Sequence, residues 1–524
     1  MRPAALPLLA ALAGLAAPAA RATGFTDLGD DIEAAPEAGF ELDGYVRARG
    51  DLLWNLDLDR GPTPSGALFF PVPLDDPTGQ LLTHADLRLR ADVAGVVPEW
   101  GVAAKLRVDV LDNLALGSVP VGPPAATSAQ GSPAAAVVVR RAYGEVLLPF
   151  GLLAAGRMGA HWGLGMLTHG GDCADCDSGD SSDRIAFLTP LAGHIWALAY
   201  DFSASGPQTP RRDGRRAVDL DPTDDVRTVT FAVLRWETDL ARERRRRADR
   251  ATVEYGLLAS YRWQENDVPA SYLPLATDVA LDGAQVMHRG LSAVAGDLWF
   301  RLTLPSFRVE LEAAVLWSRI EQPSLVPGVF LREPVESLQF GAALESEYGA
   351  LGGDFGVGLD AGFASGDATP GFGAFPTLDD DEPRPGDLDG PQAVPPWDNR
   401  ADNFRFHPDY RVDRILFREI VGTVTDAFYF RPHVRWRAVR LGAGGLDLGL
   451  AALAAFAVQT ASTPGRDRPL GVEIDPTVAY VHEGGFTAAL EYALLVPLGG
   501  LDNPDLGLEA RPAQSLRLRL VYRF

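Results

Sequence analysis

The chain alternates apolar with polar or small residues over many separate segments. Residues 87–93 read LRLRADV, residues 307–315 read FRVELEAAV and residues 516–524 read LRLRLVYRF. Successive side chains of a strand point to opposite faces, so each segment predicts a strand with one apolar and one polar face. The pattern therefore predicts an all-β protein.

Segments of this kind predict 18 strands along the chain. Their expected bounds are 43–55, 82–95, 101–114, 137–148, 152–166, 184–190, 194–203, 226–238, 250–264, 289–303, 307–321, 336–349, 354–365, 425–440, 446–460, 470–482, 486–497 and 514–524. Residues 403–424 are expected to form a loop with a short helix, because their apolar residues recur at helical spacing.

The spacers between these strands alternate between short and long. Short turns at one end and long loops at the other are typical of a transmembrane antiparallel β-barrel of the outer membrane, which has an even strand count. A sheet in lipid must close, because an open edge would leave backbone groups unpaired. A soluble β-sandwich is the alternative, but many of the segments are longer than its strands. We therefore expect a barrel of 16–18 strands with its short turns in the periplasm.

The first residues resemble an export signal. Arg2 precedes an apolar run, and Ala20-Arg21-Ala22 fits a cleavage site. We expect a signal peptide over residues 1–22, a periplasmic tail over 23–42 and the barrel over 43–524, with a long external loop at 366–424. The expected location is the outer membrane of a Gram-negative cell.

The last strand, which ends in Phe524, resembles the C-terminal strand of bacterial outer-membrane proteins. In that class the terminal aromatic residue is read by the barrel-assembly machinery. The resemblance implies this machinery and outer-membrane lipid as partners.

The composition excludes one class of partner. The net charge is -23, whereas a nucleic-acid-binding protein needs a basic face. We expect neither nucleic acid nor a cofactor.

If apolar side chains face lipid, the alternate residues line the lumen. One expected wall is mostly basic: Arg47, Arg49, Arg88, Arg90, Lys105, Arg107, Arg141, Arg157, Arg435, Arg437, Arg517 and Arg519. The opposite wall is acidic: Glu310, Glu312, Glu345, Glu347 and Asp360. Two interpretations stay open. The charges line an open, selective pore, or they pair with one another and plug the lumen.

Cys173 and Cys176 are the only cysteines, and they lie in a loop that the strand count places outside the cell. Disulfides persist there, and a loop disulfide is the favoured interpretation. A metal site with His169 is a second one, although zinc usually takes four nitrogen or sulfur ligands. A redox centre would need the pair at a helix N-terminus after a strand, which the pattern does not predict.

Residues 157–184 (RMGAHWGLGMLTHGGDCADCDSGDSSDR) and 406–424 (FHPDYRVDRILFREIVGTV) resemble an uncharacterised family of predicted bacterial outer-membrane proteins. The resemblance implies a porin-like barrel and an outer-membrane location, but no solute. Size, strand count and basic lumen are also similar to the alginate-export porins, on architecture alone.

We expect a channel for passive diffusion of small hydrophilic solutes, with anions favoured by the basic wall. One alternative is an exporter of an acidic polysaccharide. Another is a plugged barrel that binds ligands at the cell surface. An enzyme is not expected, because no serine has a convincing partner beside His161 or His169.

Overall fold

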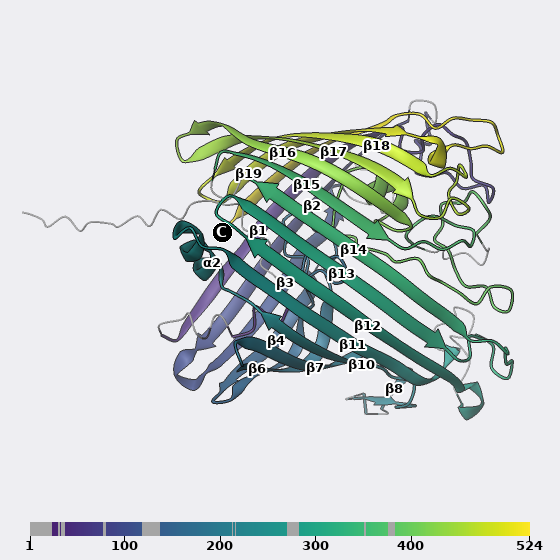
Figure 1. The fold of residues 1–524 in the computed structure, drawn as a ribbon. Coiled ribbons are helices and arrows are strands. Elements are labelled where there is room, and N and C mark those ends of the chain that lie inside the picture. Colours follow the sequence, from purple (N-terminus) through teal and green to yellow (C-terminus); the bar gives the residue numbers. More distant parts are fainter. Residues whose placement is uncertain are drawn as a thin grey trace, which may run out of the picture.

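The described chain folds into one closed antiparallel β-barrel (Figure 1). The structure is a computed structural model that describes residues 24–29, 32, 37–76, 80–117, 137–211, 213–214, 216–269, 282–349, 353–375 and 383–524. The expected signal peptide lies outside these residues.

Eighteen strands form the wall. They are β1 Gly39–Trp54, β2 Leu81–Val97, β3 Val102–Ala115, β4 Val137–Leu148, β5 Gly151–Gly159, β6 Ser181–Leu191, β7 His194–Ala204, β10 Val226–Arg235, β11 Thr252–Asp267, β12 Met287–Thr303, β13 Phe307–Ile320, β14 Val335–Tyr348, β15 Phe355–Ala364, β16 Ala427–Leu441, β17 Gly444–Ala457, β18 Pro469–His482, β19 Phe486–Pro497 and β20 Ala513–Arg523.

Each strand pairs with the next, and β20 closes the barrel against β1 in a register that sets Arg49 opposite Arg519. The 18-strand prediction is confirmed. A small hairpin of β8 (Gln208–Pro210) and β9 (Ala217–Asp219) stands apart from the wall. Helix α2 (Asp239–Arg247) lies at the end of the short turns, where the chain also ends, and the long loops gather at the other end (Figure 1).

The outer face of the wall is apolar. Exposed side chains on this face include Leu153, Leu198, Phe231, Leu257, Leu298 and Phe340. They alternate along their strands with buried residues of the inner face, as the period of two predicts. Among the described residues, no helix has both the length and the hydropathy to cross a bilayer.

Strand β5 differs from its prediction. It was expected to reach residue 166 but ends at Gly159, because the chain there turns into the barrel. A side chain at Gly159 would lie 2.8 Å from the guanidinium group of Arg141 and would displace it. The apolar residues that follow, which prolonged the strand pattern, pack inside.

The N-terminal segment also lies inside the wall. Phe25 and Ile32 are buried with Val96 and Leu188 near the short turns. The backbone N–H of Gly29 donates a hydrogen bond of 3.1 Å to Glu145 Oε2. The sequence predicted a periplasmic tail here, but residues 24–29 and 32 lie in the lumen. Their apolar side chains pack against the inner face of the wall. The tail is also shorter than expected, since β1 begins at Gly39.

Candidate functional site

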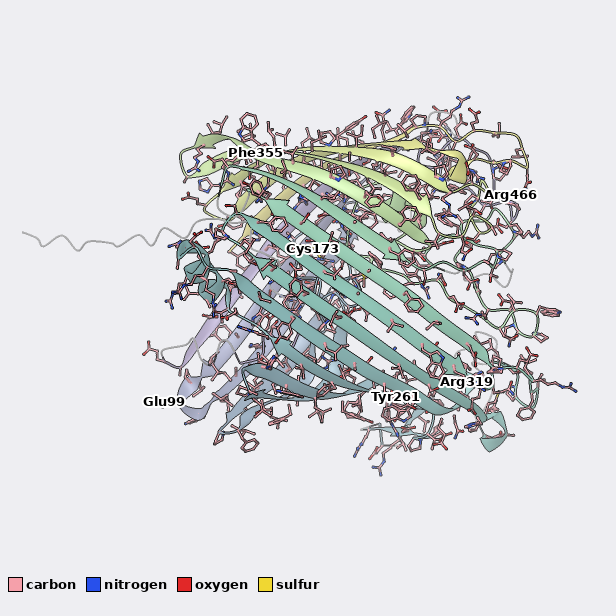
Figure 2. All side chains as sticks on the ribbon, viewed as in Figure 1. Glu99, Cys173, Tyr261, Arg319, Phe355 and Arg466 are labelled. Atoms are coloured by element: carbon pink, nitrogen blue, oxygen red, sulfur yellow. A yellow bond between two sulfur atoms is a disulfide. The ribbon has the colours of Figure 1, made fainter. Side chains whose placement is uncertain are left out.

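The loop between β5 and β6, residues 160–180, folds into the lumen. Its base is closed by the Ala160 N–H, which donates to the Asp180 carbonyl at 3.1 Å. Cys173 and Cys176 form a disulfide within it, with Cα atoms 5.1 Å apart. Figure 2 shows Cys173 between Glu99 at the short turns and Arg466 at the long loops. The prediction that this loop lies outside the cell is wrong, because the basic wall binds it.

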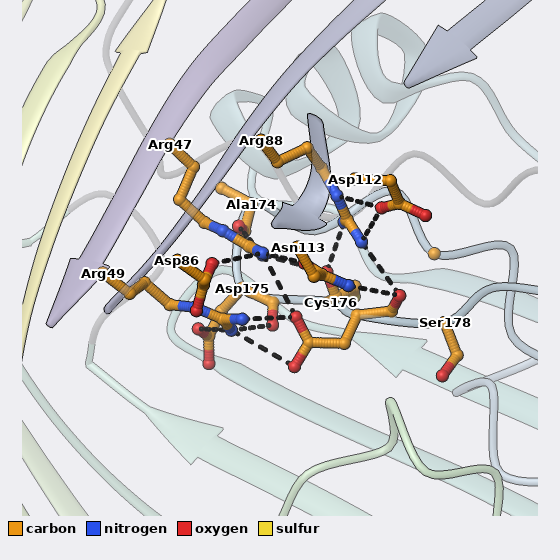
Figure 3. Close-up of polar contacts among 12 residues, drawn as sticks. Arg47, Arg49, Asp86, Arg88, Asp112, Asn113, Ala174, Asp175, Cys176 and Ser178 are labelled. Carbon is orange, nitrogen blue, oxygen red and sulfur yellow. Dashed lines mark hydrogen bonds and ion pairs between the residues drawn. The ribbon is translucent and has the colours of Figure 1, made fainter. Parts of the chain in front are cut away.

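Two arginines of the wall hold the backbone of this loop (Figure 3). Arg47 donates to the carbonyls of Ala174 and Cys176 at 3.1 and 3.0 Å. Arg88 donates to the carbonyls of Cys176 and Asp177 at 2.6 and 2.9 Å. Both arginine side chains are fully buried. The loop backbone thus supplies the acceptors that these guanidinium groups need away from water.

The loop carboxylates complete the cluster. Arg49 lies 2.7 Å from Asp177 and 3.2 Å from Asp175. Arg411 contacts the carboxylates of both aspartates, and Arg418 lies 2.8 Å from Asp175. Burial alone would raise the pKa of Asp175, but Arg418 and Arg411 lower it well below the usual range. Arg411 and Arg49 lower the pKa of Asp177 in the same way, so both carboxylates stay ionised.

The last strand borders the same cluster. Arg517 forms an ion pair with Asp51 of β1 and lies 3.8 Å from Asp175. Arg519 lies 2.8 Å from Glu491 and 3.9 Å from Asp175.

The remaining basic residues of the first strands hold the flanks of the loop. Arg90 binds the Gly171 carbonyl and lies 2.6 Å from Asp109. Arg107 and Arg141 both form ion pairs with Asp172. Lys105 lies 3.0 Å from Glu145 and 3.4 Å from the Asp27 carbonyl, so it holds the N-terminal segment instead.

Residues 403–424 form a second inward segment. Phe404, Phe406, Ile415, Leu416 and Phe417 are almost fully buried in one apolar cluster. Residues Leu416–Val421 form a π-helix, where the sequence predicted a short helix. Arg411 and Arg418 of this segment reach the Asp175 and Asp177 carboxylates, so the two inward segments meet at the arginine cluster.

Two wall glutamates anchor these segments in the same way. Glu312 accepts the backbone N–H groups of Gly165, Met166 and Leu167 at 3.0, 3.3 and 3.0 Å. Glu473 accepts those of Arg414, Ile415 and Leu416 at 2.8, 2.9 and 2.9 Å. Each carboxylate thus accepts three consecutive backbone N–H groups. The N–H group of Gly165 also donates to the Trp162 carbonyl at 2.8 Å.

The other acidic residues of the predicted wall pair with arginines of the same or a neighbouring strand or with a histidine. The pairs are Glu310 with Arg301 and Arg308, Glu345 with Arg308, Glu347 with Arg435, and Asp360 with Arg431 and His433. Internal pairing therefore accounts for these charges.

Two predicted residues lie apart from the cluster. Arg437 pairs with Asp447 at 2.7 Å, near the short turn between β16 and β17. Arg157 alternates with the buried Met158, so it faces outward, where it pairs with Asp183 at 2.7 Å. The sequence of β5 misled the assignment of its faces, because apolar or small residues occupy both of them.

His169, His407 and Asp409 bring one possible ligand atom each within 4.8 Å of the others. The Nδ1 atoms of His169 and His407 accept N–H groups of Gly171 and Asp409. In a neutral imidazole the Nε2 atom then carries the proton and donates. With both thiols in a disulfide, the group fits a hydrogen-bonded contact between the two segments better than a metal site.

A cavity of about 300 Å³ borders the cluster. Its basic residues are Arg411, Arg414, Arg418, Arg431 and Arg435, and its acidic residues are Asp175, Asp413, Asp475 and Glu491. Burial and the charge of Glu473 raise the pKa of Asp413 well above its usual range. Five guanidinium groups therefore face four carboxyl groups in this cavity.

Sequence reasoning missed Arg411, Arg414, Arg418 and Arg431. The first three follow a spacing of three and four residues in FHPDYRVDRILFREIV, a signal of one shared helical face. Only the contact between segments far apart in sequence shows that they meet Asp175.

No protein-family model matches the chain, and a search of curated proteins gave no match. Among solved structures, it is similar to OccK9 (OpdG) of Pseudomonas aeruginosa, with 13% identity, a TM-score of 0.46 and coverage of 93% of this chain and 98% of that one. It is also similar to OpdK of the same organism, solved with vanillate, with 10% identity, a TM-score of 0.44 and coverage of 93% of this chain and 100% of that one. For OmpT of Vibrio cholerae, in its trimer form, the identity is 9%, the TM-score is 0.34 and the coverage is 93% of this chain and 100% of that one.

Replacing Glu473 by alanine should release the second inward segment. Each N–H group left without an acceptor costs about 1–3 kcal/mol, so amides 414–416 should exchange hydrogen at least about tenfold faster. Hydrogen exchange with mass spectrometry measures this. Glu336→Ala, which removes a half-exposed carboxylate paired with Arg319, is the control. Unchanged exchange in Glu473→Ala would contradict the anchor.

Acid should loosen the first inward segment. Burial and the neighbouring His161 lower the pKa of His169 from 6.5 to about 4. Between these pH values His169 of an unpacked loop binds a proton, whereas His169 of the packed loop does not. The contribution of the neutral imidazole to the stability of the packed loop is therefore complete above pH 6.5 and is lost as the pH falls towards 4. Amide protection of residues 162–170, corrected for intrinsic exchange at each pH, should fall accordingly. His169→Gln should flatten this dependence; an equally steep one would exclude His169 as its source.

Proposed function

We propose that the protein is an outer-membrane channel that passes small anionic solutes through the arginine-lined cavity. The apolar outer face suits lipid, and closure of the barrel pairs the strand backbones within it, except beyond the short strands β5 and β6. The short turns then face the periplasm, as in bacterial barrels generally. The strand that ends in Phe524, paired with Gly44 of β1, is the proposed signal for the barrel-assembly machinery.

The proposal rests on the cavity of about 300 Å³ beside Asp175. Arg411 and Arg418 already bind a carboxylate there, that of Asp175. The position of Asp175 therefore defines a site with the geometry and charge to accept a solute carboxylate. Arg435, whose side chain is about half exposed, extends the positive surface along β16. Low-dielectric walls with one predominant charge raise the local concentration of the opposite ion.

The inward segments weigh against a polysaccharide exporter. They meet across the lumen at Asp175 and Asp177, and their apolar residues form a continuous buried cluster with the wall. A polymer could pass only if the contact between the two segments opened fully. A small anion needs only to exchange with a carboxylate at the arginine cluster. A plugged barrel that binds ligands at its surface remains the second candidate, because nearly all lumen charges pair internally.

Planar-bilayer recordings under a salt gradient test the channel. The wild-type protein should give a stable conductance with a reversal potential that favours anions. Arg435→Gln should lower the anion-to-cation permeability ratio about twofold or more, because a cavity charge is lost. Arg466→Gln, which changes an exposed arginine paired with Asp505 at the loop end, should leave the ratio unchanged. A closed barrel with no conductance would favour the surface-binding alternative.

A further inference from the structure

The barrel wall has a gap between β4 and β7, on the long-loop side of the short strands β5 and β6. The last pair between β4 and β5 is Ala142 with Arg157, so Val137–Arg141 of β4 have no ladder partner on β5. The Ser181 hydroxyl of β6 donates to the Arg140 carbonyl at 2.8 Å and bridges the base of this gap. The first pair between β6 and β7 is Arg184 with Asp201, so the end of β7 also continues alone on that side. The two strands end early because the chain between them turns inward. With strands about 4.8 Å apart, β4 and β7 stand about 14 Å apart at this level.

A cavity of about 430 Å³ lies in this gap. Inward-facing residues line one side of it, among them Ser182, Asp201 and Arg262. Outward-facing residues line the other, among them Val139, Arg157 and Phe202. Because β5 and β6 end here, residues of both faces of the barrel border this one cavity.

The opening lies at the border of the apolar belt nearest the long loops. Val139 and Phe202, which flank it on β4 and β7, expose 44% and 57% of their surface on the outer face. Val137, further towards the long loops, is 65% exposed. Apolar outward residues thus continue beyond the level of the Arg157–Asp183 pair. Arg227, opposite Phe202 in the register, also faces outward and is charged, so the opening lies where the apolar belt meets the polar loop end.

The charged residues in and around the cavity favour an anionic ligand. Arg140 pairs with Asp109 and Asp112, and Arg184 binds Asp201 with two contacts of 2.7 and 2.8 Å. Arg262 donates from Nε to Thr228 Oγ1 at 3.0 Å. Among the described residues, no carboxylate forms an ion pair with it. Its guanidinium group is therefore the cation that can bind a ligand.

We propose that this opening is a lateral portal, through which the anionic headgroup of a membrane lipid enters the lumen side and binds Arg262, while its acyl chains stay against Val139 and Phe202. The polar groups of the lining, including Ser182, replace water around the headgroup. The portal is distinct from the solute cavity at Asp175 and depends only on the barrel lying in a membrane.

Spin labels test the opening itself. A nitroxide at Ser182→Cys is compared with one at Ser260→Cys, an inward-facing serine of the continuous wall on β11, in phosphatidylglycerol vesicles. The native cysteines form a disulfide and leave only the introduced thiol. Collision with oxygen, which concentrates in lipid, should be at least about twofold greater at position 182. Equal collision rates, with both labels reached by a water-soluble nickel chelate, would overturn the portal.

Native mass spectrometry tests the ligand. Protein extracted from equimolar phosphatidylglycerol and phosphatidylcholine should retain phosphatidylglycerol preferentially. Arg262→Gln should reduce that preference about fivefold, whereas Arg319→Gln, at the loop end of the intact wall (Figure 2), should keep it. Equal retention of the two lipids, or an undiminished preference in Arg262→Gln, would overturn the assignment of Arg262. Anion conductance of both variants, recorded in parallel, separates this result from failure of the proposed channel.

Discussion

The interior of the barrel depends on the pairing of wall arginines with the carboxylates of one loop. Arg47 and Arg88 are buried, and a guanidinium group does not lose its proton in a protein. Burying an unpaired ion costs several kcal/mol even after relaxation. Asp175, Asp177 and the carbonyls beside them supply the missing partners. Without this loop the basic wall would have to stay in contact with water.

The same interaction determines the defect in the wall. A loop that reaches the arginines must leave the sheet early, and it does so at Gly159, seven residues before the strand pattern ends. Strands β5 and β6 then lack the length of β4, and the sheet cannot close around them at that level. The gap between β4 and β7 is thus the cost of drawing the chain inward. The bidentate pair of Arg157 with Asp183 stands at the lower edge of this gap, where a charge on the outer face is tolerated beside a polar cavity.

The sequence predicts the wall well because its physical signal is local. Period-two alternation identified all 18 strands, with most ends within a few residues. It failed where alternation is not the governing rule, as in β5, whose faces do not differ in polarity. The lumen was predicted only in part. Arg47 and Arg49 were assigned to the inner face from parity, but the position of the 160–180 loop depends on contacts across more than a hundred residues. No spacing within that loop indicates that Glu312 or Arg411 will meet it.

The internal pairing suits selective passage in the proposed channel. A site that conducts must bind its ion firmly enough to admit it and weakly enough to release it. Bare arginines in a low-dielectric cavity would hold a solute carboxylate too tightly. With Asp175 fixed between Arg411 and Arg418, an incoming anion shares these cations with a resident carboxylate and gains only the difference. Asp175 thereby limits the affinity of the site, and five guanidinium groups against four carboxyl groups keep the net charge positive, so that anions still enter in preference to cations.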